Sequence, residues 1–170
     1  MNPPTSTTTE PVRQSTGPQQ EAARVADVTI ESSRFGALEL ERSQGIDFGP
    51  GLLGFPESGT YYLLDVPETG YYAWLQSGEE PEVAFLVTSP WDFFPDYELD
   101  VPDDVQDEIS LSDPSDAEVL VLLTAHHDGG ATALTANLLG PIVVNTRTRQ
   151  ARQIVLDDTR YTTRELLRAS

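Results

Sequence analysis

The sequence predicts an all-β, mainly antiparallel domain: a single small closed or partly open β-barrel with one or two short helices. From Val25 onward, apolar and polar residues mostly alternate with a period of two. Glycine and proline interrupt this pattern every ~8–12 residues, which is typical of all-β domains. Roughly nine strands with few helices favour closure, because a closed barrel leaves no exposed strand edge.

The predicted strands are runs of alternating or continuous apolar residues, each bounded by turn signals. In chain order they cover residues 25–32, 37–42, 61–66, 71–77, 83–90, 97–101, 117–127, 132–139, 141–145 and 150–157. Residues 83–90 are apolar almost throughout, so we expect that strand to be buried on both faces. Residues 117–127 are expected to form a central strand.

Glycine and proline mark the connections between these strands. The stretch 45–59 is dense in both and predicts an irregular loop. Gly70 ends a Pro-Glu-Thr-Gly turn and can adopt a positive φ there. Asp128–Gly130 predicts a hairpin turn, and Thr146–Arg149 predicts a second one. Further residues interpreted as structural turn or loop positions are Gly36, Gly51, Gly54, Asn137 and Asn145.

Two short segments have helical spacing. Pro102 is expected to start a two-turn helix that places Val105 and Ile109 on one face. Asp103 and Asp104 fall in its first turn, where the helix dipole favours negative charge. Residues 162–170 have helical spacing at two leucines but form too short a segment to be stable unless it docks.

The chain divides into a tail and one domain. Residues 1–24 are rich in Pro, Thr, Ser and Gln and cannot bury enough apolar surface to offset chain entropy, so we expect a disordered tail before a folded domain over 25–170. The tail has no apolar block of the secretory type, and no apolar run is long enough for a membrane span. The absence of cysteine excludes disulfides and fits a reducing compartment. We expect the chain to be a monomer.

Charge is strongly segregated along the chain. Between Arg42 and Arg147 there is no Lys or Arg, and the stretch holds nineteen of the acidic residues of a chain whose formal net charge is −18. A negative field of this kind repels phosphate backbones and anionic lipid headgroups and attracts basic proteins. We expect neither direct nucleic-acid binding nor membrane binding. The Arg-rich end, Arg147–Arg168, gives a basic face that the sequence assigns to no partner.

No motif indicates catalysis, a cofactor or a metal ion. His126 and His127 are adjacent in a predicted strand, so their side chains point to opposite faces and cannot readily share one ion. The acidic run Asp96–Asp107 lacks the glycine of a calcium loop, which leaves at most weak divalent binding. The sequence Gly49–Gly54 lacks the lysine of a phosphate-binding loop. We therefore expect no enzyme, with an acidic-site enzyme or divalent-metal protein as a distant alternative.

One segment combines aromatic and acidic residues in the way a protein-binding surface does. Trp91 and the aromatic residues that follow it lie among carboxylates, which suits a basic, partly apolar partner. The competing interpretation is that the aromatic residues are ordinary core and the acids a solvated face. The candidate partner-binding residues are Asp92, Phe93, Phe94, Asp96, Tyr97, Glu98, Asp103 and Asp104.

Six segments in this order and spacing resemble the FliW flagellar assembly factor family. They are RFG (34–36), IDFGPGLLGFPE (46–57), WLQS (74–77), AFLVTSPWDFFPDYE (84–98), ANLLGPIVVN (136–145) and RQARQIVLDDTRY (149–161). The resemblance covers residues 27–167, nearly the whole predicted domain.

This resemblance implies a bacterial cytoplasmic protein with a barrel-like β-fold and no catalytic activity. Members of the family bind the RNA-binding translational regulator CsrA and stop it repressing flagellin mRNA, without competing for its RNA site. They also bind flagellin, so that free flagellin releases CsrA. The alternative function is a dedicated flagellin chaperone without CsrA antagonism. The two differ in one observable, because only the first must relieve the grip of CsrA on RNA.

Overall fold

A computed structural model describes residues 25–168, and their fold is mostly strands with one α-helix and three short 3-10 helices. The strands are β1 (Val28–Ser32), β2 (Gly36–Leu40), β3 (Ile46–Asp47), β4 (Thr60–Asp65), β5 (Tyr72–Ser77), β6 (Ala84–Thr88), β7 (Ala117–Asp128), β8 (Ala131–Ala136), β9 (Ile142–Asn145), β10 (Gln150–Gln153) and β11 (Glu165–Leu166). The helices are α1 (Asp103–Glu108), η1 (Arg42–Gln44), η2 (Pro90–Asp92) and η3 (Pro114–Asp116). The predicted tail over 1–24 lies outside the described residues.

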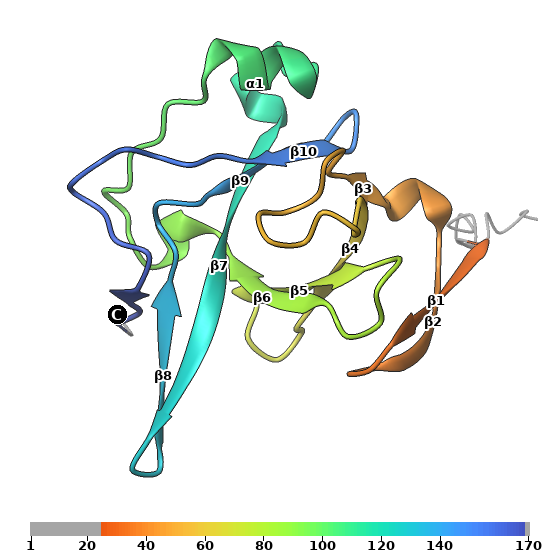
Figure 1. Ribbon diagram of the computed structural model, residues 1–170, viewed down its shortest axis with the longest axis horizontal. Coiled ribbons are helices and arrows are strands. Elements are labelled where there is room, and N and C mark those ends of the chain that lie inside the picture. The colour runs from red at the N-terminus through yellow and green to blue at the C-terminus, as the bar shows by residue number, and fades with distance from the viewer. Residues whose placement is uncertain (1–24, 169–170) are drawn as a thin grey trace, which may run out of the picture.

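Nine of the strands form one sheet that is closed in part. Its order is β11-β8-β7-β6-β5-β4-β3-β10-β9, and β9 also pairs with β7, so the strands from β7 to β9 in that order make a ring (Figure 1). Strands β8 and β11 extend from the ring, and β1 and β2 form a separate hairpin. The pairings are antiparallel except between β3 and β10. The all-β, mainly antiparallel prediction is confirmed.

Every strand of the ring contributes to the main core, because alternate side chains of a strand share one face. Ile46 in β3, Tyr61 in β4, Leu75 in β5 and Val87 in β6 are fully or almost fully buried in this cluster. The remaining buried members from the ring strands are Ala73, Leu120, Ile142, Val144 and Ala151. The ring therefore encloses a packed interior rather than a channel.

Strand β7 is apolar on consecutive residues because it is buried on both faces. Leu120 points into the main core, whereas Val121 and Leu123 pack in a second cluster with Tyr97 and Leu138. A third cluster, beneath α1, is formed by Ile109, Leu111, Val119, Val143 and Ile154. Strand β7 is thus the central strand that the sequence predicted.

Three local predictions differ from the structure. Residues 97–101 are not a strand, because the Tyr97 amide donates to the Phe94 carbonyl in a turn and the segment runs beside the second cluster without a strand partner. The segment 162–170, which has helical spacing, is not helical over its described residues 162–168; Glu165 and Leu166 instead pair with the edge of β8. In β6, only Val87 and Thr88 are fully buried, so burial on both faces holds for the second half of the strand alone.

The predicted helix and turns are confirmed. Helix α1 follows Pro102, carries Asp103 and Asp104 in its first turn, and is followed by the fully buried Ile109. Gly70 has φ 68°, and the hairpin residues Gly129 and Gly130 have φ 57° and 94°, a region where a side chain would be strained.

Tyr97 anchors the segment after β6 to the second core cluster. Its side chain is 4% exposed, and its hydroxyl donates a hydrogen bond of 2.8 Å to the Leu138 carbonyl. The indole Nε1 of Trp91 donates to the Tyr97 carbonyl at 2.9 Å. Burial, with smaller contributions from nearby Tyr161 and Asp158, raises the pKa of Tyr97 to about 12.

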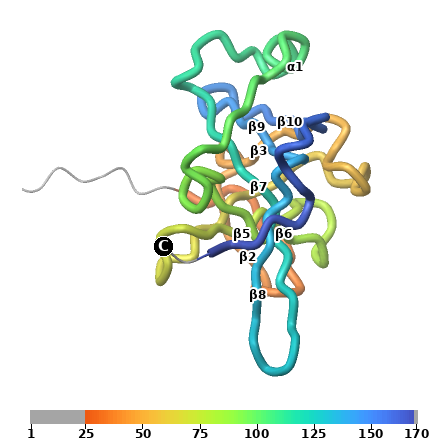
Figure 2. The backbone as a smooth tube through the Cα atoms, turned by 90° about the vertical axis from the view of Figure 1, so that its left-hand side faces the viewer, coloured from red at the N-terminus to blue at the C-terminus, as the bar shows by residue number. Residues whose placement is uncertain are grey.

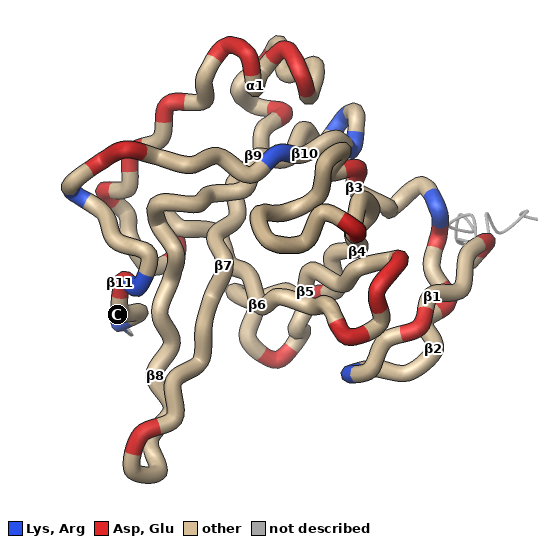
Figure 3. Tube along the Cα trace, in the orientation of Figure 1, with Lys and Arg blue, Asp and Glu red and all other residues tan. Residues whose placement is uncertain are grey.

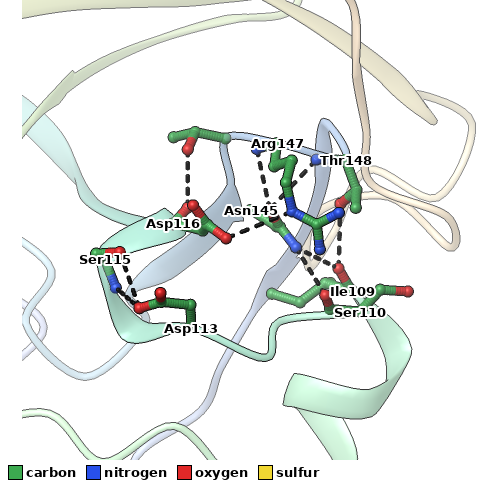
Figure 4. Close-up of polar contacts among 9 residues, drawn as sticks. Ile109, Ser110, Asp113, Ser115, Asp116, Asn145, Arg147 and Thr148 are labelled. Atoms are coloured by element: carbon green, nitrogen blue, oxygen red, sulfur yellow. Dashed lines mark hydrogen bonds and ion pairs between the residues drawn. The ribbon is translucent and has the colours of Figure 1, made fainter.

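Asn145, at the end of β9, ties the end of α1 to the β9–β10 turn (Figure 4). Its Nδ2 donates to the carbonyls of Ile109 and Ser110, at 2.9 and 3.0 Å, where the chain leaves α1. Its Oδ1 accepts from the amides of Arg147 and Thr148 in the β9–β10 turn, at 3.0 and 3.2 Å. Asn145 is fully buried, and its bond to the Ile109 carbonyl is buried, whereas the other three bonds are partly buried.

Replacing Asn145 by Ala is expected to lower the free energy of unfolding by about 1–3 kcal/mol. The Ser110 carbonyl and the Arg147 and Thr148 amides lose their side-chain partner, and the Ile109 carbonyl keeps only the Thr148 hydroxyl. Thr146→Val, in the same turn, removes only an exposed hydroxyl bond to the Asp116 carbonyl and should cost less than about 1 kcal/mol. Urea unfolding measures both values. Equal losses in the two variants would contradict the role given to Asn145.

Tyr97→Phe is expected to change how stability depends on pH. An unfolded tyrosine ionises near pH 10, whereas folded Tyr97 keeps its proton up to about pH 12. The stabilisation is therefore complete below pH 10 and is lost as the pH rises from 10 to 12, by up to about 2–3 kcal/mol. Chemical unfolding between pH 8 and 11.5 should show a smaller loss in Tyr97→Phe than in the wild type. The exposed Tyr71→Phe should follow the wild type, and a Tyr97→Phe curve parallel to the wild type would refute this reading.

Candidate functional site: an aromatic and acidic surface

The candidate surface is built by the segment that leaves β6. Ser89 and Pro90 end the strand and start η2, and the chain then turns back so that the amides of Phe93 and Phe94 donate to the Pro90 carbonyl. Proline at the first helical position fits because that position needs no amide donor. The turn brings Trp91 against Tyr97, with ring centroids 6.1 Å apart.

Phe93 joins this segment to the start of β5. Its ring stacks on Tyr72 at 5.8 Å with an interplanar angle of 9°, and it meets Tyr71 edge to face at 6.0 Å. Tyr71 is 58% exposed and Trp91 is 43% exposed, while Phe93 is half-buried. Exposed aromatic side chains held by their neighbours are the kind of anchor that protein interfaces use. We call Tyr71, Trp91, Asp92, Phe93 and Asp96 the aromatic–acidic surface.

A pocket of about 320 Å³ adjoins this surface. Aromatic and apolar side chains form most of its lining: Phe93, Phe94, Pro95, Tyr97, Leu138 and Tyr161. Asp96, Arg160 and Glu165 supply its charged groups. The combination suits an apolar or long basic side chain, whose stem would lie against the rings and whose charge would face the carboxylates.

Three of the six arginines of the C-terminal segment pair with acids of this chain, which accounts for part of the basic face that the sequence left unassigned. Figure 3 shows where acidic and basic residues lie along the described chain. Arg147 pairs with Asp116 at 3.4 Å and Arg152 pairs with Glu108 at 2.9 Å. Arg160 binds Glu98 and, at 2.8 Å, Asp158. The hydrogen bonds from Arg160 lower the pKa of Asp158. These pairs are mostly exposed, so each contributes little to stability but orients the side chains involved.

The structure brings six of the eight predicted site residues together. Asp92 and Asp96 are exposed, Phe93 and Phe94 are half-buried, and Glu98 is exposed beside Arg160. Tyr97 is buried and supports the others from below. Asp103 and Asp104 lie on α1, at another end of the molecule (Figures 1 and 2). There, Asp103 borders a separate pocket of about 450 Å³ with Leu99, Gln106 and Leu111.

Sequence reasoning missed the residues that complete this region from other parts of the chain. Tyr71 and Tyr72 come from the start of β5, and Arg160 and Tyr161 come from the segment after β10. The sequence offered one indication of them, namely that the Tyr71-Tyr72 pair and Tyr161 in the Arg-rich end are aromatic residues like those of the predicted surface. Nothing in a single sequence indicates that these residues meet Phe93 or Tyr97, since they are far apart along the chain.

The described residues show no arrangement for metal chemistry. Within 25–168, no group of three or more His, Asp or Glu side chains could hold an ion. His126 bonds to Thr135 at 2.8 Å and His127 to Thr132 at 3.0 Å. Also within 25–168, no helix is both long and apolar enough to cross a membrane.

Comparison with known proteins agrees with the fold and with the order of the sequence motifs. The family model of the FliW protein matches residues 29–167. The flagellar assembly factor FliW of Moorella thermoacetica is 40% identical over 138 residues, covering 81% of this chain and 87% of that protein. The protein of the same name from Magnetococcus marinus is 39% identical over 129 residues, covering 76% and 79%.

A solved structure gives the same result in three dimensions. The crystal structure of a flagellar assembly factor FliW superposes with a TM-score of 0.76 at 31% identity, covering 84% of this chain and 99% of that one. Sequence and structure therefore agree over nearly all of the described residues. The chain belongs to the FliW family of flagellar assembly factors.

Proposed function

We propose that this chain acts in flagellar assembly by binding other proteins, without catalysis of its own, in the bacterial cytoplasm. It binds CsrA and antagonises the repression of flagellin mRNA by that regulator, and it binds flagellin. Free flagellin would then displace the chain from CsrA and couple flagellin synthesis to assembly. The family supports a role in flagellar assembly, because its members carry that name.

The observation that carries the choice of partner is the aromatic–acidic surface. A protein that binds RNA offers positive charge to phosphates, so an acidic protein attracts it over about a Debye length. Asp92 and Asp96 are exposed on the same segment as the exposed Trp91, and Asp92 borders a pocket with Tyr71. The rings add apolar contact area to the electrostatic attraction. This combination favours a basic protein partner over nucleic acid or a lipid surface.

The charge distribution also supports antagonism without competition. Nineteen acids and no Lys or Arg lie between Arg42 and Arg147, and only a few of these acids are paired with the C-terminal arginines. Held next to an RNA-binding surface, such a protein would oppose incoming phosphates through its field and its bulk. It would not need to imitate RNA or to occupy the RNA site.

A dedicated flagellin chaperone is the second candidate, and the aromatic pocket is the observation that favours it. Rings from Phe93, Phe94, Tyr97 and Tyr161 could shield an apolar side chain of flagellin without any help from charge. Calorimetric titration with CsrA and, separately, with flagellin distinguishes the candidates. Binding to both supports the first, binding to flagellin alone supports the chaperone, and binding to neither contradicts both.

Reversing the charge of Asp92, Asp96, Asp103 and Asp104 to Lys is expected to slow association with CsrA by about 10-fold or more at low salt and to flatten its salt dependence. Stopped-flow association at several salt concentrations measures both. Two double variants, each carrying two of these four substitutions, serve as matched controls. Asp92→Lys with Asp96→Lys should also speed dissociation, because these residues flank the aromatic rings, whereas Asp103→Lys with Asp104→Lys should change association alone. An unchanged rate and salt slope would contradict the surface assignment.

Tyr71→Ala is expected to weaken CsrA binding by about 10-fold, because it removes the most exposed ring of the aromatic–acidic surface. Leu53→Ala is the control, since Leu53 is 62% exposed on the loop before β4 and lies outside that surface. Titration calorimetry compares the two variants with the wild type. Wild-type affinity in Tyr71→Ala, or an equal loss in both variants, would argue against an aromatic anchor at this position.

A further inference from the structure

Strands β7 and β8 continue past the rest of the sheet as a two-stranded ribbon, residues 124–135. The pairing of β6 with β7 ends where Leu86 faces Leu123, and β7 runs on to Asp128 with β8 as its partner. Figures 1 and 2 both show the ribbon projecting from the body of the molecule. The β8 edge is partly covered, because β11 pairs with Thr135 and the Leu167 amide donates to the Leu134 carbonyl.

The β7 edge of the ribbon presents unpaired backbone groups. Asp128 faces Ala131 across the two-residue Gly129-Gly130 turn, which makes this a hydrogen-bonded pair. Alternation then directs the N–H and C=O groups of Ala125 and His127 away from β8. Over residues 25–168, no strand pairs with Thr124–Asp128 on that side. Two amides and two carbonyls are thus available in the geometry of a strand edge.

The ribbon lacks the features that normally protect such an edge. Natural edges carry Lys, Pro, inward-pointing charges or a covering segment. Residues 124–135 contain neither Lys nor Pro, and Asp128, beside the turn, is their one formally charged residue. The histidine side chains are occupied within the ribbon, with Thr132 and Thr135. The backbone groups are therefore what this ribbon offers to a ligand.

Charge separates this edge from the aromatic–acidic surface. From Val119 to Leu156, Asp128 is the sole acidic residue in a chain of net charge −18. The ribbon itself therefore provides little Coulomb attraction to a basic surface. Backbone hydrogen bonding at an edge is largely independent of sequence, and it requires a partner segment whose own backbone is not yet paired. A protein subunit that has not yet been assembled offers such a segment.

We propose that the β7 edge at Ala125 and His127 binds an extended segment of flagellin as an added strand, an inference that rests on the proposed binding of flagellin. The segment spans about four to five residues and carries no acidic side chain, because the field of the whole chain disfavours one. Its side chains lie over Ala125 and alternate between the two faces of the ribbon. CsrA, which is attracted by the acidic surface, does not use this edge.

Proline substitution tests the proposal, because it removes one amide donor. Ala125→Pro removes a donor on the free β7 edge and keeps the hydrogen bonds to β8. Thr132→Pro, which faces His127, removes the corresponding outward donor on the β8 edge and is the matched control, although it also removes the hydroxyl that bonds to the His127 ring. Calorimetric titration with purified flagellin should show at least a 10-fold loss of affinity for Ala125→Pro and less than a twofold change for Thr132→Pro. Affinity for CsrA should be unchanged in both.

The outcomes separate this inference from the proposed function. If the wild type binds flagellin and Ala125→Pro binds it within twofold, or both proline variants lose affinity equally, the added strand is refuted and the proposed function stands. If the wild type binds neither flagellin nor CsrA, both proposals fail.

Amide hydrogen exchange in the wild-type protein gives a second test that needs no variant. Flagellin should slow exchange at Ala125 and His127 by at least 10-fold and leave Thr132 unchanged. Unaltered exchange at Ala125 and His127 in the complex overturns the proposal.

Discussion

The fold depends on β9, the strand that closes the ring by pairing with β7 on one side and β10 on the other. All four of its residues are buried, and its last residue, Asn145, holds the end of α1 and the β9–β10 turn through four hydrogen bonds (Figure 4). One of these bonds satisfies the carbonyl group of Ser110. Ser110 has a backbone φ of 55°, which is unusual for a residue with a side chain. Without this strand, both edges that it pairs with would be open.

Closure leaves the outside of the ring free for other contacts. The second core cluster packs against the outer face of β7 and carries the aromatic–acidic surface, while the third supports α1 and its acids. Arg147, Arg152 and Arg160 bind acids near these two clusters, so that the chain neutralises part of its own negative charge. The ribbon is the continuation of β7 and β8, the two strands that contribute side chains to the second cluster. One central strand thus connects the core to two chemically different surfaces.

The sequence predicted what depends on local pattern. Alternation identified the strands other than the two-residue β3 and β11, the glycine pair at 129–130 identified the hairpin, and Pro102 with the following acids identified α1. It did not predict which strands pair, because a period of two fixes the face of a residue and not its neighbour. For the same reason, Trp91 and Phe93 stood out as a cluster, but their contacts with Tyr71, Tyr72 and Tyr161 required the fold. The alternation at 97–101 suggested a strand, and Tyr97 instead turns inward to bond with Leu138.

Under the proposed function, this chain releases flagellin mRNA from CsrA, and flagellin, by binding the chain, returns CsrA to the mRNA. The most direct test follows labelled flagellin leader RNA bound to CsrA while the purified chain is added, followed by flagellin. The account predicts that the chain releases the RNA from CsrA and that flagellin restores the CsrA–RNA complex. An RNA complex that stays intact while the chain binds flagellin would contradict the account and leave a flagellin chaperone in its place.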